Sequence, residues 1–169
     1  SDVCSSDLEL SKRLGRPIEF VQCQFGSLVP GLKRGDFDLA MNGLEVTPDR
    51  LGEVRFSRPY YLYRLQLTAR DDDARFHSLE ECQACGGVVG TLEDTAAERL
   101  LDKLGVAKRV YDSQFEPYTD LRLGRIDAVL MDLPIAVQAR KKIAGLRHAG
   151  ESQAAGCYAI AFRKDDEAL

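Results

Sequence analysis

The alternation of short apolar runs with helical patterns most limits what this chain can fold into. Residues 126–131 form an apolar run interrupted by Asp127, and a helical pattern over 133–142 follows at once. The same order occurs upstream, where a run at 87–90 precedes an amphipathic helix over 95–104. Strands that alternate with helices favour parallel sheets covered by helices on both faces. The sequence therefore predicts an α/β fold.

Other segments extend this alternation toward both ends of the chain. The pattern predicts further helices at 8–14, 27–34 and 116–123, and further strands at 18–21, 38–42, 65–70 and 109–111. In the strand at 65–70, Leu65, Leu67 and Ala69 alternate with polar residues. That period of two predicts a strand with one buried and one exposed face.

Composition excludes several classes of function. The chain has 169 residues, which allow one ordinary domain or two small lobes, and its 44% hydrophobic content can build a core. A net charge of −4 with scattered basic residues gives no support for nucleic-acid binding. No run reaches membrane-spanning length, and no signal peptide is visible. We expect no nucleic-acid partner and no cofactor.

The cysteines do not form a recognisable metal or redox motif. There are five, and Cys82 and Cys85 make a lone C-x-x-C. A zinc site would need a second pair, and His77 and His148 are poorly spaced to supply one. A redox motif should open a helix after a strand, whereas this one precedes an expected strand. With Cys4 set aside as part of an atypical opening, we expect unligated or locally bridged cysteines and no metal.

The segment around Arg50 has the chemistry of an anion site. Thr47 is a good N-cap and Pro48 suits the first helical position, which places Arg50 in the first turn of a short helix. A guanidinium there adds to the unpaired N–H groups at the helix start, and arginine grips a carboxylate with two parallel bonds. An isolated arginine in such a place would be better interpreted as a solvated surface residue.

The motifs around Arg50 resemble a known family. Gly43-x-x-x-Thr47-Pro48-x-Arg50 followed by Phe-Ser-x-Pro-Tyr-Tyr at 56–61 resembles the extracytoplasmic solute-binding proteins that deliver amino acids to ABC importers. The resemblance continues into Gly-Arg-Ile-Asp-Ala-Val-Leu-Met-Asp at 124–132 and covers about 8–169.

The resemblance implies a two-lobed fold of the periplasmic-binding-protein type II, with parallel or mixed sheets flanked by helices. Lobe 1 would comprise 1–66 plus 156–169, and lobe 2 the inserted segment 67–155. Two crossing strands would form the hinge, and the lobes would close around ligand. Relative to the family, we expect a fragment trimmed at both ends, with the signal peptide missing.

The resemblance also implies a set of ligand-binding residues. They are Phe25, Gly43, Glu45, Arg50, Thr91, Thr95 and Asp132. Arg50 would bind the α-carboxylate of an amino acid, aided from the other lobe by the helix start at Thr95. Asp132 and the carbonyl of Gly43 would accept the ammonium, and Phe25 would pack on the side chain.

Two of these assignments have plainer alternatives. Thr95 belongs to the segment 90–95, which includes Thr91 and resembles a ligand-binding loop of the family, but Thr95 could be a simple N-cap. Asp132 ends an apolar strand, at the edge where ligands bind in α/β sheets, but it could be the N-cap of the helix over 133–142.

Glu45 is the main departure from the family, in which many members have threonine at this position. Its side chain either pairs with Arg50 or faces a cationic part of the ligand, or it points to solvent so that only its backbone matters. Together with Glu93 and Asp132 it would form an acidic rim. Such a rim favours a polar or basic amino acid over an acidic one.

The implied function is that of a substrate-binding protein or domain of an ABC importer. It would be a monomer outside the cytoplasmic membrane, working with a permease subunit or a fused permease domain, and a lipid anchor could attach it to the membrane. The alternatives are a dehydratase-like periplasmic enzyme of the same fold and a ligand-sensing ectodomain. We expect no catalysis, because neither histidine lies near the matched pocket positions.

Overall fold

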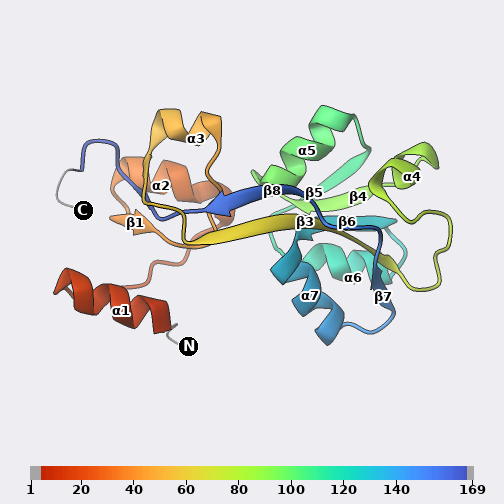
Figure 1. Ribbon diagram of the computed structural model, residues 1–169, viewed down its shortest axis with the longest axis horizontal. Helices are drawn as coiled ribbons and strands as arrows, with labels where there is room; N and C mark the ends of the chain where they lie inside the picture. The colour runs from red at the N-terminus through yellow and green to blue at the C-terminus, as the bar shows by residue number, and fades with distance from the viewer. Residues whose placement is uncertain (1–4, 167–169) are drawn as a thin grey trace.

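The chain folds into two groups of elements joined by two long strands (Figure 1). The computed structural model describes residues 5–166, with side chains from residue 9 onward. In Figure 1, β3 (Tyr61–Arg70) and β8 (Gln153–Tyr158) run from one group to the other. Among the described residues, no helix is both long and apolar enough to cross a membrane. The lobe boundaries expected at 66/67 and 155/156 stay a prediction.

Helices and strands alternate through most of the chain. The helices are α1 (Ser5–Leu14), η1 (Phe25–Ser27), α2 (Leu28–Arg34), α3 (Pro48–Glu53), α4 (Leu79–Ala84), α5 (Ala96–Leu104), α6 (Glu116–Arg122) and α7 (Leu133–Lys142). Besides β3 and β8, the strands are β1 (Leu39–Ala40), β2 (Arg55–Phe56), β4 (Val89–Leu92), β5 (Lys108–Tyr111), β6 (Ala128–Asp132), β7 (Leu146–His148) and β9 (Ala161–Phe162).

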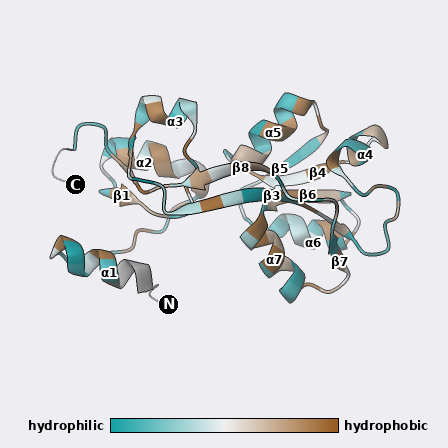
Figure 2. Cartoon of the chain, viewed as in Figure 1, coloured by the Kyte–Doolittle hydropathy of each residue, from teal (hydrophilic) through white to brown (hydrophobic). Residues whose placement is uncertain are grey.

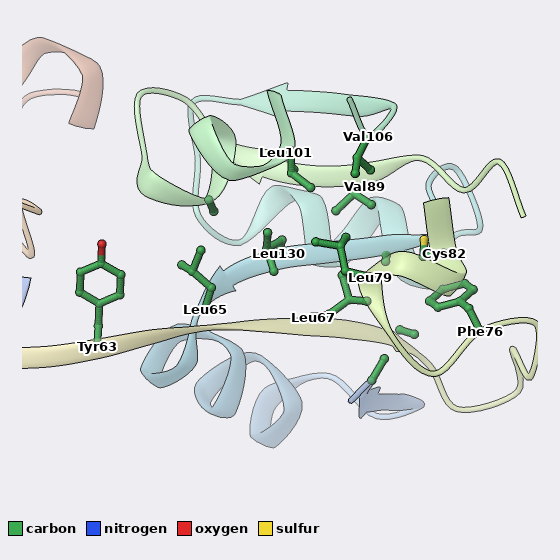
Figure 3. Packing of buried hydrophobic residues seen from close by; sticks show 14 residues of the cluster. Tyr63, Leu65, Leu67, Phe76, Leu79, Cys82, Val89, Leu101, Val106 and Leu130 are labelled. Carbon is green, nitrogen blue, oxygen red and sulfur yellow. The ribbon is translucent and has the colours of Figure 1, made fainter. Parts of the chain in front are cut away.

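The larger sheet is mixed, with the order β5-β4-β6-β3-β7 and β8 paired to β3. β4 runs parallel to β5 and β6, whereas β3 is antiparallel to β6, β7 and β8. One apolar cluster, which includes Leu67, Leu101 and Leu130, fills the space between this sheet and α5 (Figure 3). A second cluster, which includes Tyr118 and Met131, lies on the other face. The α/β prediction, with helices on both faces, is confirmed.

The prediction of a half-exposed strand at 65–70 is wrong. Residues 65–69 are all buried, including the polar Gln66 and Thr68. Helix α7 packs against β3, so the face that the alternation assigned to solvent is covered. The Gln66 amide is accommodated there because its Nε2 donates to the carbonyls of Leu67 and Gly150, at 2.9 and 3.2 Å.

The smaller sheet has three short strands in the order β1-β9-β2. A separate apolar cluster connects it to α2 and to the segment around Leu44. In the hydropathy view, α2 and α3 both contain apolar and polar residues (Figure 2), and α2 buries Leu28, Val29 and Leu32. This group of elements therefore has its own, smaller core.

The strand predicted at 18–21 does not form. The segment has no regular structure, and Phe20 and Val21 are 66% and 55% exposed. A strand requires a paired neighbour for its backbone groups, and in the described part of the chain β1 pairs only with β9. The strand predicted at 38–42 is reduced to the two residues of β1 for the same reason.

The described cysteines, Cys23, Cys82, Cys85 and Cys157, are all free thiols. Cys82 is buried in α4, and burial raises the pKa of its thiol to about 12. Cys85 is exposed and, like Cys82, is a free thiol, so the C-x-x-C pair is not bridged. No group of three or more potential metal-ligating side chains occurs within residues 5–166. Cys4 lies outside the described residues.

Candidate functional site

A cavity of about 350 Å³ lies between the two groups of elements, beside β8. Five of the seven predicted site residues line it, namely Phe25, Gly43, Glu45, Thr95 and Asp132. The other lining residues are Cys23, Gln24, Asn42, Leu92, Ala97, Asp112, Ser113, Gln114, Met131, Ile135 and Tyr158. The fold thus brings together residues that are more than one hundred positions apart.

The helix start predicted at Thr47 is confirmed. Thr47 Oγ1 accepts a hydrogen bond from the Arg50 N–H at 3.4 Å, and Pro48 takes the first helical position of α3. This cap fixes where the helix begins and aims Arg50 toward α5. Arg50 is 4% exposed, which excludes the solvated surface arginine.

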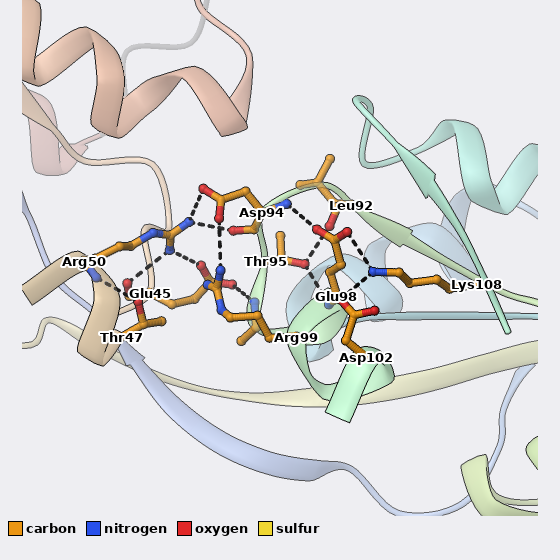
Figure 4. Close-up of polar contacts among 11 residues, drawn as sticks. Glu45, Thr47, Arg50, Leu92, Asp94, Thr95, Glu98, Arg99, Asp102 and Lys108 are labelled. Atoms are coloured by element: carbon orange, nitrogen blue, oxygen red, sulfur yellow. Dashed lines mark hydrogen bonds and ion pairs between the residues drawn. The ribbon is translucent and has the colours of Figure 1, made fainter. Parts of the chain in front are cut away.

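Arg50 lies at the centre of a polar network rather than in the cavity wall (Figure 4). Its Nη1 donates to Glu45 Oε2 at 2.6 Å and to the Glu45 carbonyl at 3.2 Å. Its Nη2 donates to the Asp94 carbonyl at 2.6 Å and to Asp94 Oδ2 at 3.0 Å. The guanidinium also lies 5.6 Å from the centre of the Phe25 ring. These bonds connect α3 to the loop before α5.

Glu45 does not point to solvent, so that alternative is wrong. Its side chain is 1% exposed and pairs with Arg50, as the first alternative predicted. The second carboxylate oxygen, Oε1, accepts the N–H of Ala96 at the start of α5, at 2.9 Å. A buried carboxylate needs such partners because an unpaired one would be strongly destabilising. Its backbone is held by a bridge to Tyr158.

The two threonines of the segment 90–95 have different environments. Thr95 caps α5 by accepting the Glu98 N–H at 3.3 Å, and its hydroxyl donates to the Leu92 carbonyl at 2.7 Å. It therefore is an N-cap, and it also lines the cavity. Thr91 is fully buried, and its hydroxyl donates to the Leu130 carbonyl at 3.1 Å. Thr91 does not line the cavity.

Asp132 ends β6 and faces the cavity. Asp132 occupies the N-cap position of α7, as the alternative predicted, but its side chain makes no capping hydrogen bond to the helix. Instead its Oδ2 accepts a hydrogen bond from the Tyr158 hydroxyl. Burial, together with the nearby charge of Glu45, raises the pKa of Asp132 to about 7, although the bond from Tyr158 opposes this.

Tyr158 is the main site residue that sequence reasoning missed. Its ring stacks on Tyr63 and Tyr61, with centroids 4.8 and 5.6 Å away. Tyr61 lies opposite Tyr158 in the β3–β8 register, so only a correct pairing of these distant strands could have revealed the stack. The Tyr60 hydroxyl accepts the N–H of Gly43 at 3.2 Å and so positions the cavity wall. Asp94, the second partner of Arg50, was also missed.

The charged residues that line the cavity are all acidic: Glu45, Asp112 and Asp132. Glu93, predicted to complete an acidic rim, is exposed and does not line the cavity. Asp112 is the third acidic residue of the lining instead of Glu93. Its Oδ2 accepts a hydrogen bond from the side-chain amide of Gln24 at 3.1 Å. Because Glu45 is paired with Arg50, the preference of the cavity for a cation rests on Asp112 and Asp132.

Comparison with known proteins places this geometry in a family. The sequence model of the bacterial extracellular solute-binding proteins, family 3, matches residues 8–169. The chain belongs to this family.

Relatives of this family 3 chain include named binding proteins. ABC transporter arginine-binding protein 1 of Escherichia coli strain K12 is 29% identical over 179 residues, covering 100% of this chain and 72% of the relative. The arginine-binding periplasmic protein of Mannheimia haemolytica is 28% identical, covering 84% and 57%. The L-cystine-binding protein TcyJ of E. coli K12 is 28% identical, covering 95% and 61%. The chain thus spans from over half to under three quarters of these relatives.

Solved structures of similar proteins share the fold. Holo ArgBP from T. maritima superposes with a TM-score of 0.88 at 27% identity, covering 94% of this chain and 70% of that one. An ancestral arginine-binding protein bound to glutamine also gives 0.88, at 29% identity with 95% and 73% covered. AncCDT-1, an ancestral amino acid-binding protein and precursor of cyclohexadienyl dehydratase, gives 0.83 at 26% identity, covering 95% and 71%. This solute-binding protein has the two-lobed type II fold.

Proposed function

We propose that this chain is the substrate-binding protein or domain of an ABC importer, which holds a polar amino acid or a close derivative between two lobes. The observation that carries the proposal is the cavity beside β8, whose charged lining residues are acidic only. An acidic lining favours a basic ligand. The relatives named as arginine-binding proteins support the same class.

Recognition in this proposal needs no bond to be made or broken. Asp132 and the carbonyl of Gly43 accept the donors of a ligand ammonium, and the faces of Phe25 and Tyr158 contact its apolar part. Bending of β3 and β8 brings the lobes together, which removes the ligand from water and strengthens these contacts. Closure also forms the surface to which the permease binds.

The partners and location belong to the same proposal. The chain works as a monomer outside the cytoplasmic membrane and delivers its solute to a permease subunit or to a fused permease domain. The relatives named as periplasmic or extracellular binding proteins support this location. Attachment through a lipid anchor or through the fused permease would keep the chain near the transporter.

Two other functions of the fold serve as outcomes of the test. A dehydratase-like enzyme is favoured by the similarity to AncCDT-1 and by Asp132, a carboxyl whose pKa of about 7 suits proton transfer. Neither His77 nor His148 lines the cavity. A sensory ectodomain would use the same binding chemistry, and a kinase domain encoded downstream would identify it.

A thermal-shift screen of the complete gene product tests the proposal. The panel holds the common amino acids, several polyamines and small organic acids, because a ligand that binds only the folded state raises the melting temperature. We expect a shift with a basic or polar compound, and its loss in Asp132→Ala. Glu93→Gln removes an exposed charge outside the cavity and should keep the shift.

Two results would contradict the proposal, and a third would remove its support. Turnover of a prephenate-like acid would indicate the enzyme. A shift caused only by acidic compounds would exclude the proposed ligand class. No shift with any compound would leave the function as an importer receptor without support.

A further inference from the structure

The groups suited to bind a ligand carboxylate are already bound by the protein itself. These groups are the guanidinium of Arg50 and the N–H groups at the start of α5, a nine-residue helix. Figure 4 shows the Glu45 carboxylate between them. One oxygen accepts Arg50 Nη1 at 2.6 Å, and the other accepts the Ala96 N–H at 2.9 Å. Glu45 thus makes the contacts that an α-carboxylate would make.

The neighbouring donors are also used. Arg50 Nη2 is held by the carbonyl and the carboxylate of Asp94. The Asp94 N–H donates to Glu98 Oε2 at 2.7 Å, and the Thr95 hydroxyl donates to the Leu92 carbonyl. Within this network, Arg50 Nε and Arg99 Nη2 are buried and lack a hydrogen-bond partner among the described residues. Both Arg50 Nη atoms and the Ala96 N–H are therefore already bonded within the protein.

A second carboxylate in this place would be unfavourable. It would have to displace Glu45, which is 1% exposed, and it would add a third carboxylate to a network in which Glu45 and Asp94 already pair with Arg50, and Asp94 also with Arg99. Like charges held close together in a buried site repel strongly. The rest of the cavity offers acceptors instead, because Asp112 and Asp132 are its other charged lining residues.

We propose that Glu45 is a built-in carboxylate that determines specificity, so that the ligand is a small organic cation with no free α-carboxylate. Its chemical class is the aliphatic or guanidino amines, such as the decarboxylated forms of basic amino acids. The cation lies against Asp132, and its chain lies between the faces of Phe25 and Tyr158. This inference rests on the proposed function, because it refines the ligand of the same binding site.

Matched pairs of ligands test the inference directly. Calorimetry on the complete gene product compares agmatine with arginine, putrescine with ornithine, and cadaverine with lysine, where each pair differs only by the carboxylate. We expect at least one amine to bind about ten-fold or more tightly than its parent amino acid, equivalent to about 1.4 kcal/mol. Equal or tighter binding of every parent amino acid would overturn the inference.

Glu45→Thr supplies the reciprocal test. The shorter side chain releases Arg50 Nη1 and the Ala96 N–H, so the ratio of amine to amino acid affinity should reverse. Glu93→Gln, which removes an exposed charge outside the cavity, should leave the ratio unchanged. An unchanged ratio in Glu45→Thr would overturn the inference. If that variant does not fold, Glu45→Gln keeps the shape of the side chain and should reduce the ratio of amine to amino acid affinity. An unchanged ratio in Glu45→Gln would likewise overturn the inference.

The outcomes separate this inference from the proposed function. Equal or tighter binding of the parent amino acid in every pair would support an importer receptor and overturn the role of Glu45. Binding of neither set by a folded wild-type protein would overturn both.

Discussion

At the scale of single residues, the buried Arg50–Glu45 pair has consequences for stability as well as for binding. Both side chains are at most 5% exposed, and the N···O distance is 2.6 Å. A buried pair contributes little over an apolar pair of the same shape, but breaking it exposes an uncompensated charge to the interior. Removal of either side chain would therefore leave the other buried without its ion-pair partner.

Arg50→Met should destabilise the fold by about 3–5 kcal/mol, because Glu45 would stay buried without its counter-ion. Urea unfolding near neutral pH measures this. Arg13→Met is the matched control, since the Arg13–Glu9 pair is exposed and should change stability by about 0.5 kcal/mol or less. The double variant with Glu45→Gln should recover part of the loss. A cost of Arg50→Met as small as that of the control would contradict the buried-pair interpretation.

Asp132 should give the binding site a pH dependence. Its pKa is raised to about 7 by burial and by Glu45, while the Tyr158 hydroxyl opposes the shift. Below that pH the carboxyl is neutral and attracts a cation less, so affinity for a cationic ligand should fall as the pH drops from about 8 to about 6. Calorimetry across this range measures it, and Asp132→Asn should bind weakly at every pH. A wild-type affinity that does not vary would contradict this prediction.

The same shift should appear in stability with a defined sign. The folded state keeps the Asp132 proton up to about pH 7, whereas the unfolded state releases it near the ordinary value of 3.8. This contribution to stability is fully present below about pH 4 and is lost as the pH rises through 7. The variant Asp132→Asn has no titrating carboxyl at this position, so it does not show this pH-dependent loss of stability. Its unfolding free energy, relative to wild type, should therefore increase between these pH values in urea titrations, and a constant difference would contradict the assignment.

At the scale of elements, close packing of β4 against α6 limits what its residues can be. A Cβ added at Gly90 would lie 2.6 Å from Ile126 Cδ1, 3.1 Å from Pro117 Cβ and 3.2 Å from Tyr111 Cε2. Gly52 in α3 has no atom within 4 Å of the equivalent position. Gly90 is closely packed and Gly52 is not, so the same substitution at the two positions provides a test and its control.

Gly90→Ala should destabilise the protein by about 1–3 kcal/mol, because the added methyl group overpacks the sheet–helix contact. Gly52→Ala should be neutral or stabilise it by up to about 1 kcal/mol, because alanine is the better helix former. Urea midpoints of both variants, measured together, provide the check. Equal effects of the two substitutions would show that β4 and α6 are not packed as described.

At the scale of the whole molecule, the two groups of elements differ in core size. Two apolar clusters cover both faces of the larger sheet, whereas one smaller cluster supports β1, β2 and β9. Opening free energies in native proteins follow such differences in buried contacts. The segment 68–153 is therefore expected to be the more stable unit.

Hydrogen exchange followed by mass spectrometry should resolve this difference. Amides of β3, β4 and β6 should exchange slowest, and those of 17–24, which has no regular structure, fastest. Limited digestion with chymotrypsin should cleave first at exposed Phe20 and leave 68–153 intact. Early loss of peptides from the larger sheet would contradict the expected order.

The sequence alone was enough for features that depend on local chemistry. The start of α3 at Thr47 and Pro48 and the cap of α5 by Thr95 were predicted, and α7 has the expected bounds of 133–142. Caps and helical periodicity involve residues three or four positions apart, so a single sequence contains the necessary information. The motifs that resemble family 3 added the two-lobed fold.

Tertiary structure alone decided which side chains meet. It covered both faces of β3, left 18–21 without a partner strand, and placed the Tyr158 hydroxyl on Asp132. It also gave Glu45 its two partners, although the sequence had left its direction open. These outcomes depend on strand register and on packing between distant segments, where burial and pairing energies override local preference.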